Sequence, residues 1–319
     1  MNAYENKLLK HQKDGIEWIN SCEMRGTGGI LADEAGLGKK KQMIIAMTKN
    51  VQQRTLIVAP FTSIDSWKNT LTEHGLNTIV LNNEKAWNSL RVPQIMDATY
   101  YLINYQKIIR RQRLLELTWD RIVFDDGRVL QNPANKVFIA AFALLGKLRW
   151  LLISNLPEEI PDSFKSLLPC NILRRSLYRI QGGPPRPDIY RIKPDMTTNP
   201  LYTLLLKVNK PSVIYCKNTT EVLKTKTLLL EKGSVEDNIY TCYREQEEIV
   251  RMNNYIQSTI NPKAILIVCT RGILEQLKLH MFGAIFFVNP NISDLYLERL
   301  CRRVICIGQK NIVPVFIFS

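Results

Sequence analysis

The sequence predicts an α/β fold of two lobes, each built around a mostly parallel sheet with helices on its faces. Short runs of apolar, β-branched residues recur along the whole chain, and stretches with helical periodicity lie between them. Runs of this kind are typical of strands that are buried on both faces of a sheet. Their regular alternation with helices is typical of parallel sheets with crossover connections. One segment rich in glycine and proline separates the two halves of the chain.

The expected strands are four to six residues long, and turn-forming or polar residues border each of them. We place these strands at residues 55–59, 100–103, 121–124, 150–153, 213–216, 264–269, 284–288 and 313–318. The expected helices lie between the strands, at residues 7–21, 40–48, 134–145, 219–230, 246–256 and 294–304. A further apolar strand end at Gly29 leads into a glycine-rich turn.

A chain of 319 residues has the length of two ordinary domains. Residues 181–187, with the sequence QGGPPRP, are the clearest break, because glycine and proline disfavour both helix and strand. We therefore expect an N-terminal lobe at residues 1–180, a shortened linker region at 181–210 and a C-terminal lobe at 211–319.

The net charge of +14 indicates a polyanionic partner, most often nucleic acid, with a solvated basic surface as the alternative. No apolar run approaches the roughly 20 residues of a membrane span, and the N-terminus lacks the basic and apolar regions of a signal peptide. We therefore expect neither membrane association nor secretion. The seven cysteines are scattered without C-x-x-C spacing, which argues against a zinc site and fits a reducing compartment.

The most informative motif is the stretch from Gly29 to Gln42, GILADEAGLGKKKQ. Its order of strand end, glycine-rich turn and lysine-rich helix start is that of a phosphate-binding loop. Backbone N–H groups at such a turn and at the helix N-terminus point at phosphates, and Lys39 would reach the β- and γ-phosphate oxygens. The next residue should supply a hydroxyl to magnesium, and here it is Lys40.

Other motifs accompany this loop in a characteristic order. They are LLKHQKDGIEWI at 8–19, TLIVAP at 55–60 followed by Ser66 and Trp67, WDRIVFDDGRVLQN at 119–132, RWLLISN at 149–155 and LCRRVICIGQ at 300–309. In this order and composition the chain resembles the Swi/Snf family of double-stranded-DNA-stimulated ATPases, within the superfamily-two helicases. The resemblance covers the chain from about Leu8 to Phe318, and the series is far more specific than a glycine-rich loop alone.

The resemblance implies two RecA-like lobes of the P-loop NTPase helicase type, with ATP as cofactor and Mg²⁺ at a site that Lys40 damages. It implies a double-stranded DNA partner and action in transcription regulation or the remodelling of DNA–protein complexes. Transcription or chromatin proteins as further partners, a nuclear location and a monomeric chain are also implied. The short region between the lobes resembles compact, diverged viral members of the family, for which the location would be the host nucleus.

Matching positions carry the family's implied roles into this sequence. Gln12 matches the glutamine that reads the adenine edge, Asp125 the acid that holds magnesium through water, and Asp126 the acid that polarises the attacking water. Arg303 matches an arginine finger of the second lobe that faces an ATP site between the lobes. The implied nucleotide contacts of the loop are Asp33, Gly36, Leu37, Gly38, Lys39 and Lys40, with Lys39 also in the catalytic set. The candidate nucleic-acid contacts, to phosphates rather than bases, are Arg174, Arg175 and Lys217.

Several of these positions depart from the family pattern. A lysine charge ~6 Å from a divalent ion at an effective dielectric of ~20 would cost about 5 kcal/mol, an upper bound for Lys40 because its stem can swing away. Asp126 is one methylene shorter than the family's glutamate, and misplacing a catalytic group by ~1 Å can cost about a hundredfold in rate. Arg128, Ser154 and Asn155 replace the family's histidine and Gly-Thr pair. Full family-like turnover is therefore not expected.

Two functions fit this sequence. The first is a weak motor that hydrolyses ATP when duplex DNA closes the lobes and remodels DNA–protein complexes. The second is a catalytically dead pseudo-ATPase that binds DNA and serves as a regulator or scaffold. A third function, that of another phosphate-loop protein such as a nucleotide kinase, is disfavoured by Arg303 and by the Gly308-Gln309 pair in a second α/β lobe.

Overall fold

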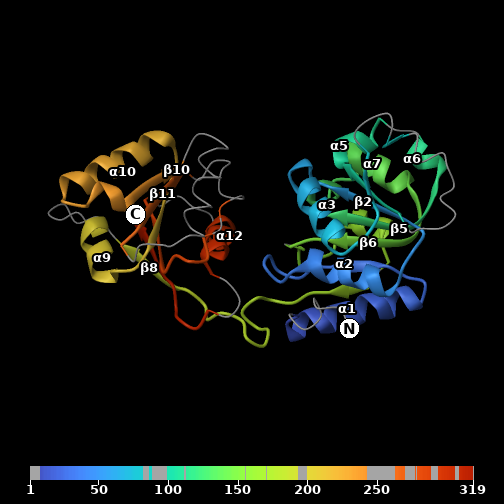
Figure 1. The fold of residues 1–319 in the computed structure, drawn as a ribbon, viewed down its shortest axis with the longest axis horizontal. Helices are drawn as coiled ribbons and strands as arrows, with labels where there is room; N and C mark the ends of the chain where they lie inside the picture. The colour runs from blue at the N-terminus through green and yellow to red at the C-terminus, as the bar shows by residue number, and fades with distance from the viewer. Residues whose placement is uncertain are drawn as a thin grey trace. The chain divides into compact units, whose positions relative to one another are not determined.

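The computed structural model describes residues 8–81, 86–87, 99–110, 113–154, 156–169, 171–192, 200–242, 263–269, 277, 279–288, 294–305 and 309–318. The chain divides into two compact units, Met1–Gln181 and Gly182–Ser319, which we call unit 1 and unit 2. Each unit holds one sheet with helices beside it (Figure 1). No helix within the described part of the chain combines the length and the apolar character needed to cross a bilayer.

The sheet of unit 1 has seven strands in the order β3-β4-β2-β5-β6-β1-β7, and every pairing in it is parallel. The strands are β1 Gly29–Leu31, β2 Arg54–Ala59, β3 Thr78–Val80, β4 Thr99–Asn104, β5 Thr118–Asp125, β6 Leu145–Leu152 and β7 Ile172–Leu173. The helices are α1 Lys10–Met24, α2 Lys39–Lys49, α3 Ile64–Glu73, α5 Tyr105–Ile108, α6 Arg113–Glu116, α7 Lys136–Ala143 and α8 Asp162–Leu167.

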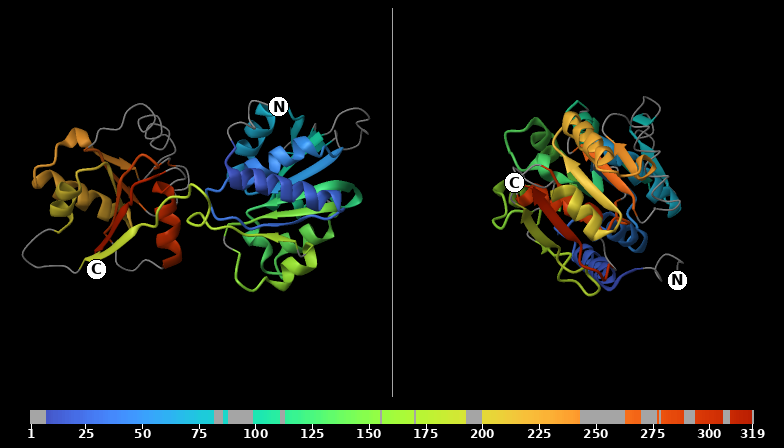
Figure 2. Two further views of the ribbon diagram at one scale, coloured as in Figure 1. Left: turned by 90° about the horizontal axis from the view of Figure 1, so that it is seen from below. Right: turned by 90° about the vertical axis from the view of Figure 1, so that its left-hand side faces the viewer.

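Helices cover both faces of this sheet (Figure 2). Apolar residues of α1, α2 and α3 pack on one face, and those of α5, α7 and α8 pack on the other. Strand β2 shows why both faces need cover, since Leu56 and Val58 point into one cluster and Ile57 and Ala59 into the other. Because all strands run the same way, their carboxyl ends share one edge of the sheet, which is where ligands bind in open α/β folds.

A buried ion pair ties the helices to the sheet of unit 1. The side chains of Glu23 in α1 and Arg121 in β5 are both fully buried, with 2.5 Å between Arg121 Nη2 and Glu23 Oε2. Trp150 Nε1 donates to Glu23 Oε1 at 2.8 Å, and Asn50 Nδ2 donates to Glu23 Oε2 at 2.6 Å. Arg121 Nη2 also donates to the carbonyl of Asn50 at 2.7 Å, so the charges sit in a satisfied network.

Unit 2 has a six-stranded parallel sheet in the order β10-β11-β9-β12-β13-β8. Its strands are β8 Asp188–Ile192, β9 Ser212–Cys216, β10 Ile239–Cys242, β11 Ile265–Cys269, β12 Ala284–Phe287 and β13 Pro314–Phe318. Its helices are α9 Pro200–Val208, α10 Thr219–Glu231 and α12 Asp294–Val304. Phe286 and Phe316 stack across neighbouring strands with centroids 4.9 Å apart, at the centre of the core.

The predicted fold class is confirmed, since both sheets are parallel and lie in an α/β arrangement. All eight predicted strands overlap strands of the structure, while β3, β7, β8 and β10 went unpredicted. Within residues 181–210, for which the sequence predicted a linker, the structure has β8 and α9, and β8 pairs with β13 as an edge strand of unit 2. The helix predicted at 246–256 lies outside the described residues.

Candidate functional site

The glycine-rich loop joins the carboxyl end of β1 to the first residue of α2. Gly36 and Gly38 have φ values of +91° and +77°, in the left-handed region that glycine adopts without strain. Gly38 is the N-cap of α2, and a Cβ there would lie 2.6 Å from Nε2 of Gln12. The first turn of α2 therefore begins at the carboxyl edge of the sheet, where the N-terminus of a helix favours anions.

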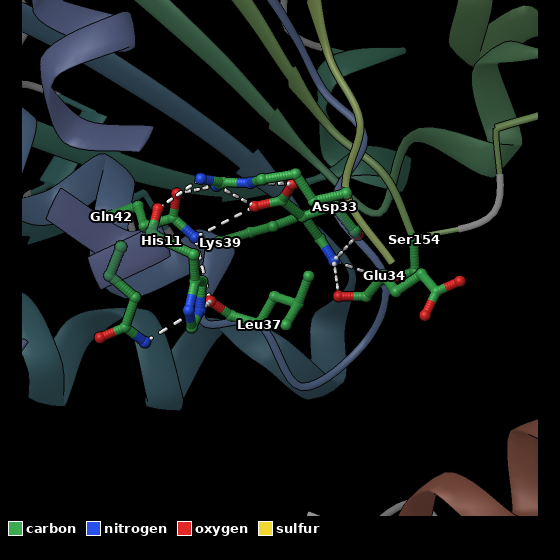
Figure 3. A network of polar contacts seen from close by, with 9 residues as sticks. His11, Asp33, Glu34, Leu37, Lys39, Gln42 and Ser154 are labelled. Atoms are coloured by element: carbon green, nitrogen blue, oxygen red, sulfur yellow. Dashed lines mark hydrogen bonds and ion pairs between the residues drawn. The ribbon is translucent and has the colours of Figure 1, made fainter. Parts of the chain in front are cut away.

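The ammonium of Lys39 is held against the base of this loop (Figure 3). It donates to the carbonyls of Asp33 and Glu34 at 2.6 and 3.2 Å, and to Oγ of Ser154 at 2.9 Å. Ser154 follows β6, so this contact links the loop to the neighbouring strand end. A phosphate bound at the loop would take the place of these acceptors for the same ammonium.

Arg175 anchors the loop through an ion pair with Asp33, whose side chain is fully buried. Arg175 Nε and Nη2 donate to the two carboxylate oxygens of Asp33 at 2.9 and 2.5 Å, and Nη2 also donates to Oε1 of Gln42 at 2.8 Å. Nη1 of Arg175 donates to the carbonyl of His11. The arginine that the sequence predicted as a nucleic-acid contact is thus engaged inside unit 1, whereas its neighbour Arg174 is exposed.

The backbone around Arg175 is bonded to the loop as well. The N–H of Glu34 donates to the carbonyl of Arg175 at 3.0 Å, and the N–H of Leu177 donates to Oε2 of Glu34 at 2.7 Å. The segment after β7 therefore runs alongside the loop and is hydrogen-bonded to it at Glu34.

Three side chains converge on the carbonyl of Leu37 in the loop. His11 Nε2 lies 3.2 Å from this oxygen, Gln42 Nε2 donates to it at 3.0 Å, and Gln12 Nε2 makes a longer contact of 3.5 Å. Burial lowers the pKa of His11, so the ring is neutral and donates from Nε2. The carboxamide oxygen of Gln12 also accepts the N–H of Leu9 at 3.2 Å, which places the predicted adenine-reading glutamine beside the loop.

His11 and Gln42 are contacts that the sequence did not predict. Gln42 lies three residues after Lys39, one helical turn along α2, and that spacing was the available signal. A close approach of α1 makes the arrangement possible, because a Cβ on Gly15 would lie 1.9 Å from Oε1 of Gln42. Such an approach depends on tertiary packing and leaves no trace in the local sequence.

The two acids at the end of β5 have separate partners. Asp125 Oδ2 accepts the indole N–H of Trp67 at 2.7 Å. Burial raises the pKa of Asp125, opposed by the Trp67 hydrogen bond and by the charge of Lys40. Asp126, at φ +48°, is gripped by Arg128, whose Nε and Nη2 donate to its two oxygens at 2.7 and 2.6 Å. The position expected to polarise water is therefore neutralised by an arginine two residues along the chain.

Lys40 points toward α3 and not toward the loop. Its ammonium donates to Oγ of Ser66 at 3.0 Å and lies 5.1 Å from the centroid of the Trp67 ring. Burial lowers the pKa of Lys40, opposed by the charge of Asp125.

A magnesium site of the expected type does not fit these residues. The hydroxyl ligand is replaced by an amine, one oxygen of Asp125 is taken by an indole N–H, and a cation stands nearby. Across the described part of the structure, no three His, Cys, Asp or Glu side chains gather into a metal-binding group.

A cavity of about 710 Å³ opens beside Asp126, at the carboxyl ends of β2, β4 and β5. Pro60, Phe61, Asn104 and Arg128 are among the residues that line it. The Phe61 ring is 80% exposed, an unusual position for a large aromatic side chain. The cavity therefore has an aromatic side chain and the Asp126–Arg128 ion pair in its lining.

The predicted residues of unit 2 are described only in part. Arg303 belongs to α12, and its side chain lies outside the described part of the structure. Lys217 is exposed directly after β9, where its backbone N–H donates to Oε2 of Glu221 at 2.6 Å. Asn155, one of the departures from the family pattern, is also outside the described residues.

Comparisons with known proteins agree with the resemblance. The family model for the SNF2-related domain matches residues 11–168. The "Probable global transactivator" of Orgyia pseudotsugata multicapsid polyhedrosis virus is 33% identical over 156 residues, covering 46% of this chain and 31% of the relative. The ISWI chromatin-remodeling complex ATPase ISW2 of Saccharomyces cerevisiae is 29% identical over 164 residues, covering 48% of this chain and 15% of the relative. This chain thus spans less than a third of the length of both relatives.

A solved structure resembles the fold over almost the whole chain. The Sulfolobus solfataricus SWI2/SNF2 ATPase core in complex with dsDNA has a TM-score of 0.54 and 18% sequence identity, covering 98% of this chain and 88% of that one. The predicted helicase-type fold with RecA-like lobes is confirmed by this likeness.

Proposed function

We propose, from the match of residues 11–168 to the SNF2-related domain family, that the chain binds ATP and double-stranded DNA with weakened ATP hydrolysis. It would act in transcription regulation or in the remodelling of DNA–protein complexes. The observation that carries the proposal is the loop with Gly36 and Gly38 at positive φ, leading into the N-terminus of α2 beside Lys39.

The nucleotide half of the proposal uses the loop and its neighbours. The β- and γ-phosphates would accept from the N–H groups at the start of α2 and from Lys39. Gln12 lies against Gly38, so its carboxamide would exchange its bonds to Leu9 and Leu37 for the adenine edge. The buried pair of Asp33 and Arg175 would keep the loop in shape during this exchange.

Weakened hydrolysis follows from the acid at the end of β5. A carboxylate polarises water only with a free lone pair aimed at it. Both oxygens of Asp126 accept from Arg128, and although each keeps a further lone pair, the guanidinium fixes the direction of the carboxylate and makes it a weaker base toward water. The pair is half exposed and therefore of modest strength, which slows the step without forbidding it. The role of Arg303 as an arginine finger stays a prediction.

The DNA half of the proposal rests on charge. The net charge of +14 favours a polyanion. Arg174 follows the carboxyl end of β7, and Lys217 follows that of β9, where phosphates would be met. The names of the relatives refer to chromatin remodelling and transactivation, which supports chromatin or transcription proteins as partners and action in the nucleus. That the chain is a monomer stays a prediction.

The second candidate is a pseudo-ATPase that binds DNA and serves as a regulator or scaffold. The bidentate grip of Arg128 on Asp126 favours it, together with the misfit of a magnesium site around Lys40. ATP turnover measured with and without duplex DNA separates the two candidates, because only the first predicts phosphate release that rises with DNA.

Lys39→Ala is expected to weaken ATP binding by about tenfold or more, because it removes a charged donor from the phosphates. Equilibrium titration with ATP measures the change. Lys41→Ala is the matched control, since it removes the same charge from the same helical turn and should leave most of the affinity. Equal affinity of Lys39→Ala and the unaltered chain would contradict nucleotide binding at this loop.

Affinity for duplex DNA is expected to fall with salt, with a slope of log affinity against log salt of about −0.9 per phosphate contact. Fluorescence anisotropy of a labelled duplex between ~50 and ~200 mM salt gives the slope. Arg174→Ala should make the slope shallower by about 1. Lys147→Ala is the control, and it should leave the slope unchanged. Lys147 is an exposed lysine in β6 that pairs with Asp120. A flat salt response would remove nucleic acid as the partner.

A further inference from the structure

We propose that the ammonium of Lys40 is the resident cation of the nucleotide site, so that this site binds nucleotide phosphates without a divalent metal ion. The inference rests on the nucleotide binding proposed above and names the cation that the site uses. On this inference, the lysine that replaces the expected magnesium ligand itself supplies the positive charge that the phosphates need.

The position of Lys40 in the fold is the first argument. It is the second residue of α2, directly after Lys39, at the helix end where N–H groups and the helix dipole favour anions. Its backbone therefore stands where a hydroxyl would hold the metal. A lysine at this place adds a full positive charge to a site already built for phosphate oxygens.

The surroundings of the ammonium are the second argument. Ser66 Oγ accepts from Lys40 Nζ at 3.0 Å, and the Trp67 ring lies under it with its centroid at 5.1 Å. Both partners come from α3, and Trp67 is fully buried. A cation over a buried indole face is held by the ring quadrupole as well as by its hydrogen bond. Lys40 is thus positioned by the protein rather than left in solvent.

Trp67 connects this cation to the acid expected to hold magnesium. The indole N–H donates to Asp125 Oδ2 at 2.7 Å while the same ring carries the ammonium. The ammonium of Lys40 and the carboxylate of Asp125 thus share one indole, which places a positive charge near the acid that was expected to hold magnesium.

A divalent ion would find too few oxygen ligands at this site and would be repelled by a nearby positive charge. Mg²⁺ demands oxygen ligands in near-octahedral geometry, and the protein oxygen next to Lys39 is missing. It would also meet the like charge of Lys40 close by. The flexible stem of Lys40 can instead follow the phosphates when they bind, moving from Ser66 to their oxygens.

The test is a titration of the full chain with ATP, in excess EDTA and again with millimolar Mg²⁺. The unaltered chain is expected to bind in EDTA, with a dissociation constant within about threefold of that in Mg²⁺. Lys40→Thr is expected to lose about tenfold or more in EDTA, as for a charged donor removed from a phosphate, and to recover when Mg²⁺ is added. Lys40→Arg, which keeps the charge, should bind in EDTA as the unaltered chain does.

Lys41→Thr serves as the matched control, because it removes one lysine from the same turn and leaves the Ser66 and Trp67 contacts in place. It should show no new dependence on Mg²⁺. Binding of ATP by the unaltered chain only in Mg²⁺ would overturn this inference alone. Absence of binding in both buffers would overturn the proposed nucleotide site with it. If Lys40→Thr binds ATP in EDTA as tightly as the unaltered chain does, Lys40 is not the cation of the nucleotide site.

Discussion

Replacing Glu23 with alanine is expected to lower the free energy of unfolding of unit 1 by about 3–5 kcal/mol, the cost of leaving one partner of a buried ion pair alone. Arg121 would stay fully buried without a carboxylate. The indole N–H of Trp150 and the amide of Asn50 would lose their acceptor at the same time. Arg121 and Trp150 are fully buried and cannot turn to solvent, so their desolvation penalty is felt in full.

Tryptophan fluorescence during urea unfolding measures this effect on unit 1 alone, because all five tryptophans of the chain lie before residue 151. The matched control is Lys147→Ala, which breaks an exposed ion pair to Asp120, the residue before Arg121. It should cost at most about 1 kcal/mol. A change in Glu23→Ala no larger than in this control would show that the buried network contributes little.

The paired substitution Lys40→Thr with Asp126→Glu is expected to raise DNA-stimulated phosphate release by about tenfold to a hundredfold. Threonine restores the hydroxyl beside Lys39, and glutamate moves the carboxylate one methylene farther from the backbone. The gain should require Mg²⁺, since threonine brings back a metal ligand in place of a cation. Phosphate release with duplex DNA, in Mg²⁺ and in EDTA, measures it.

Lys39→Ala in the doubly substituted chain is the control, and it should abolish any gain by removing the phosphate-binding lysine. A third arm adds Arg128→Ala, which frees the new glutamate from its neighbour. If phosphate release stays unchanged in both the double and the triple variant, these residues do not limit turnover, and the weakness of hydrolysis lies elsewhere in the chain.

The sequence predicted the parallel sheets well because buried strands carry their own signal. Strands such as β2 and β9 are runs of apolar residues that no exposed helix would tolerate. Strand β7 has two residues and β3 has three, too few to form a run. Helix α3 went unpredicted although Ile64, Trp67 and Leu71 follow its apolar stripe. There the signal was present and was missed.

Within the site, the sequence located the loop but not the partners of its charged residues. Spacing along the chain shows that Lys40 follows Lys39, and it cannot show that Lys40 turns to Ser66 and Trp67. The Asp126–Arg128 pair joins neighbours in sequence and depends on the left-handed backbone at Asp126. Arg175 was predicted to meet phosphates as part of the basic cluster with Arg174. Its pairing with Asp33 spans 142 positions, a distance across which local patterns carry no information.

The attachment of the segment after β7 has a mechanical consequence. Arg175 and Leu177, which hold Asp33 and Glu34, lie a few residues before the point where the chain leaves unit 1 at Gln181. A force on the chain beyond Gln181 would act first on the bonds of Arg175 and Leu177 to the loop, and only then on the sheet. Tension from the rest of the chain would thus reach the glycine-rich loop before it reaches the sheet.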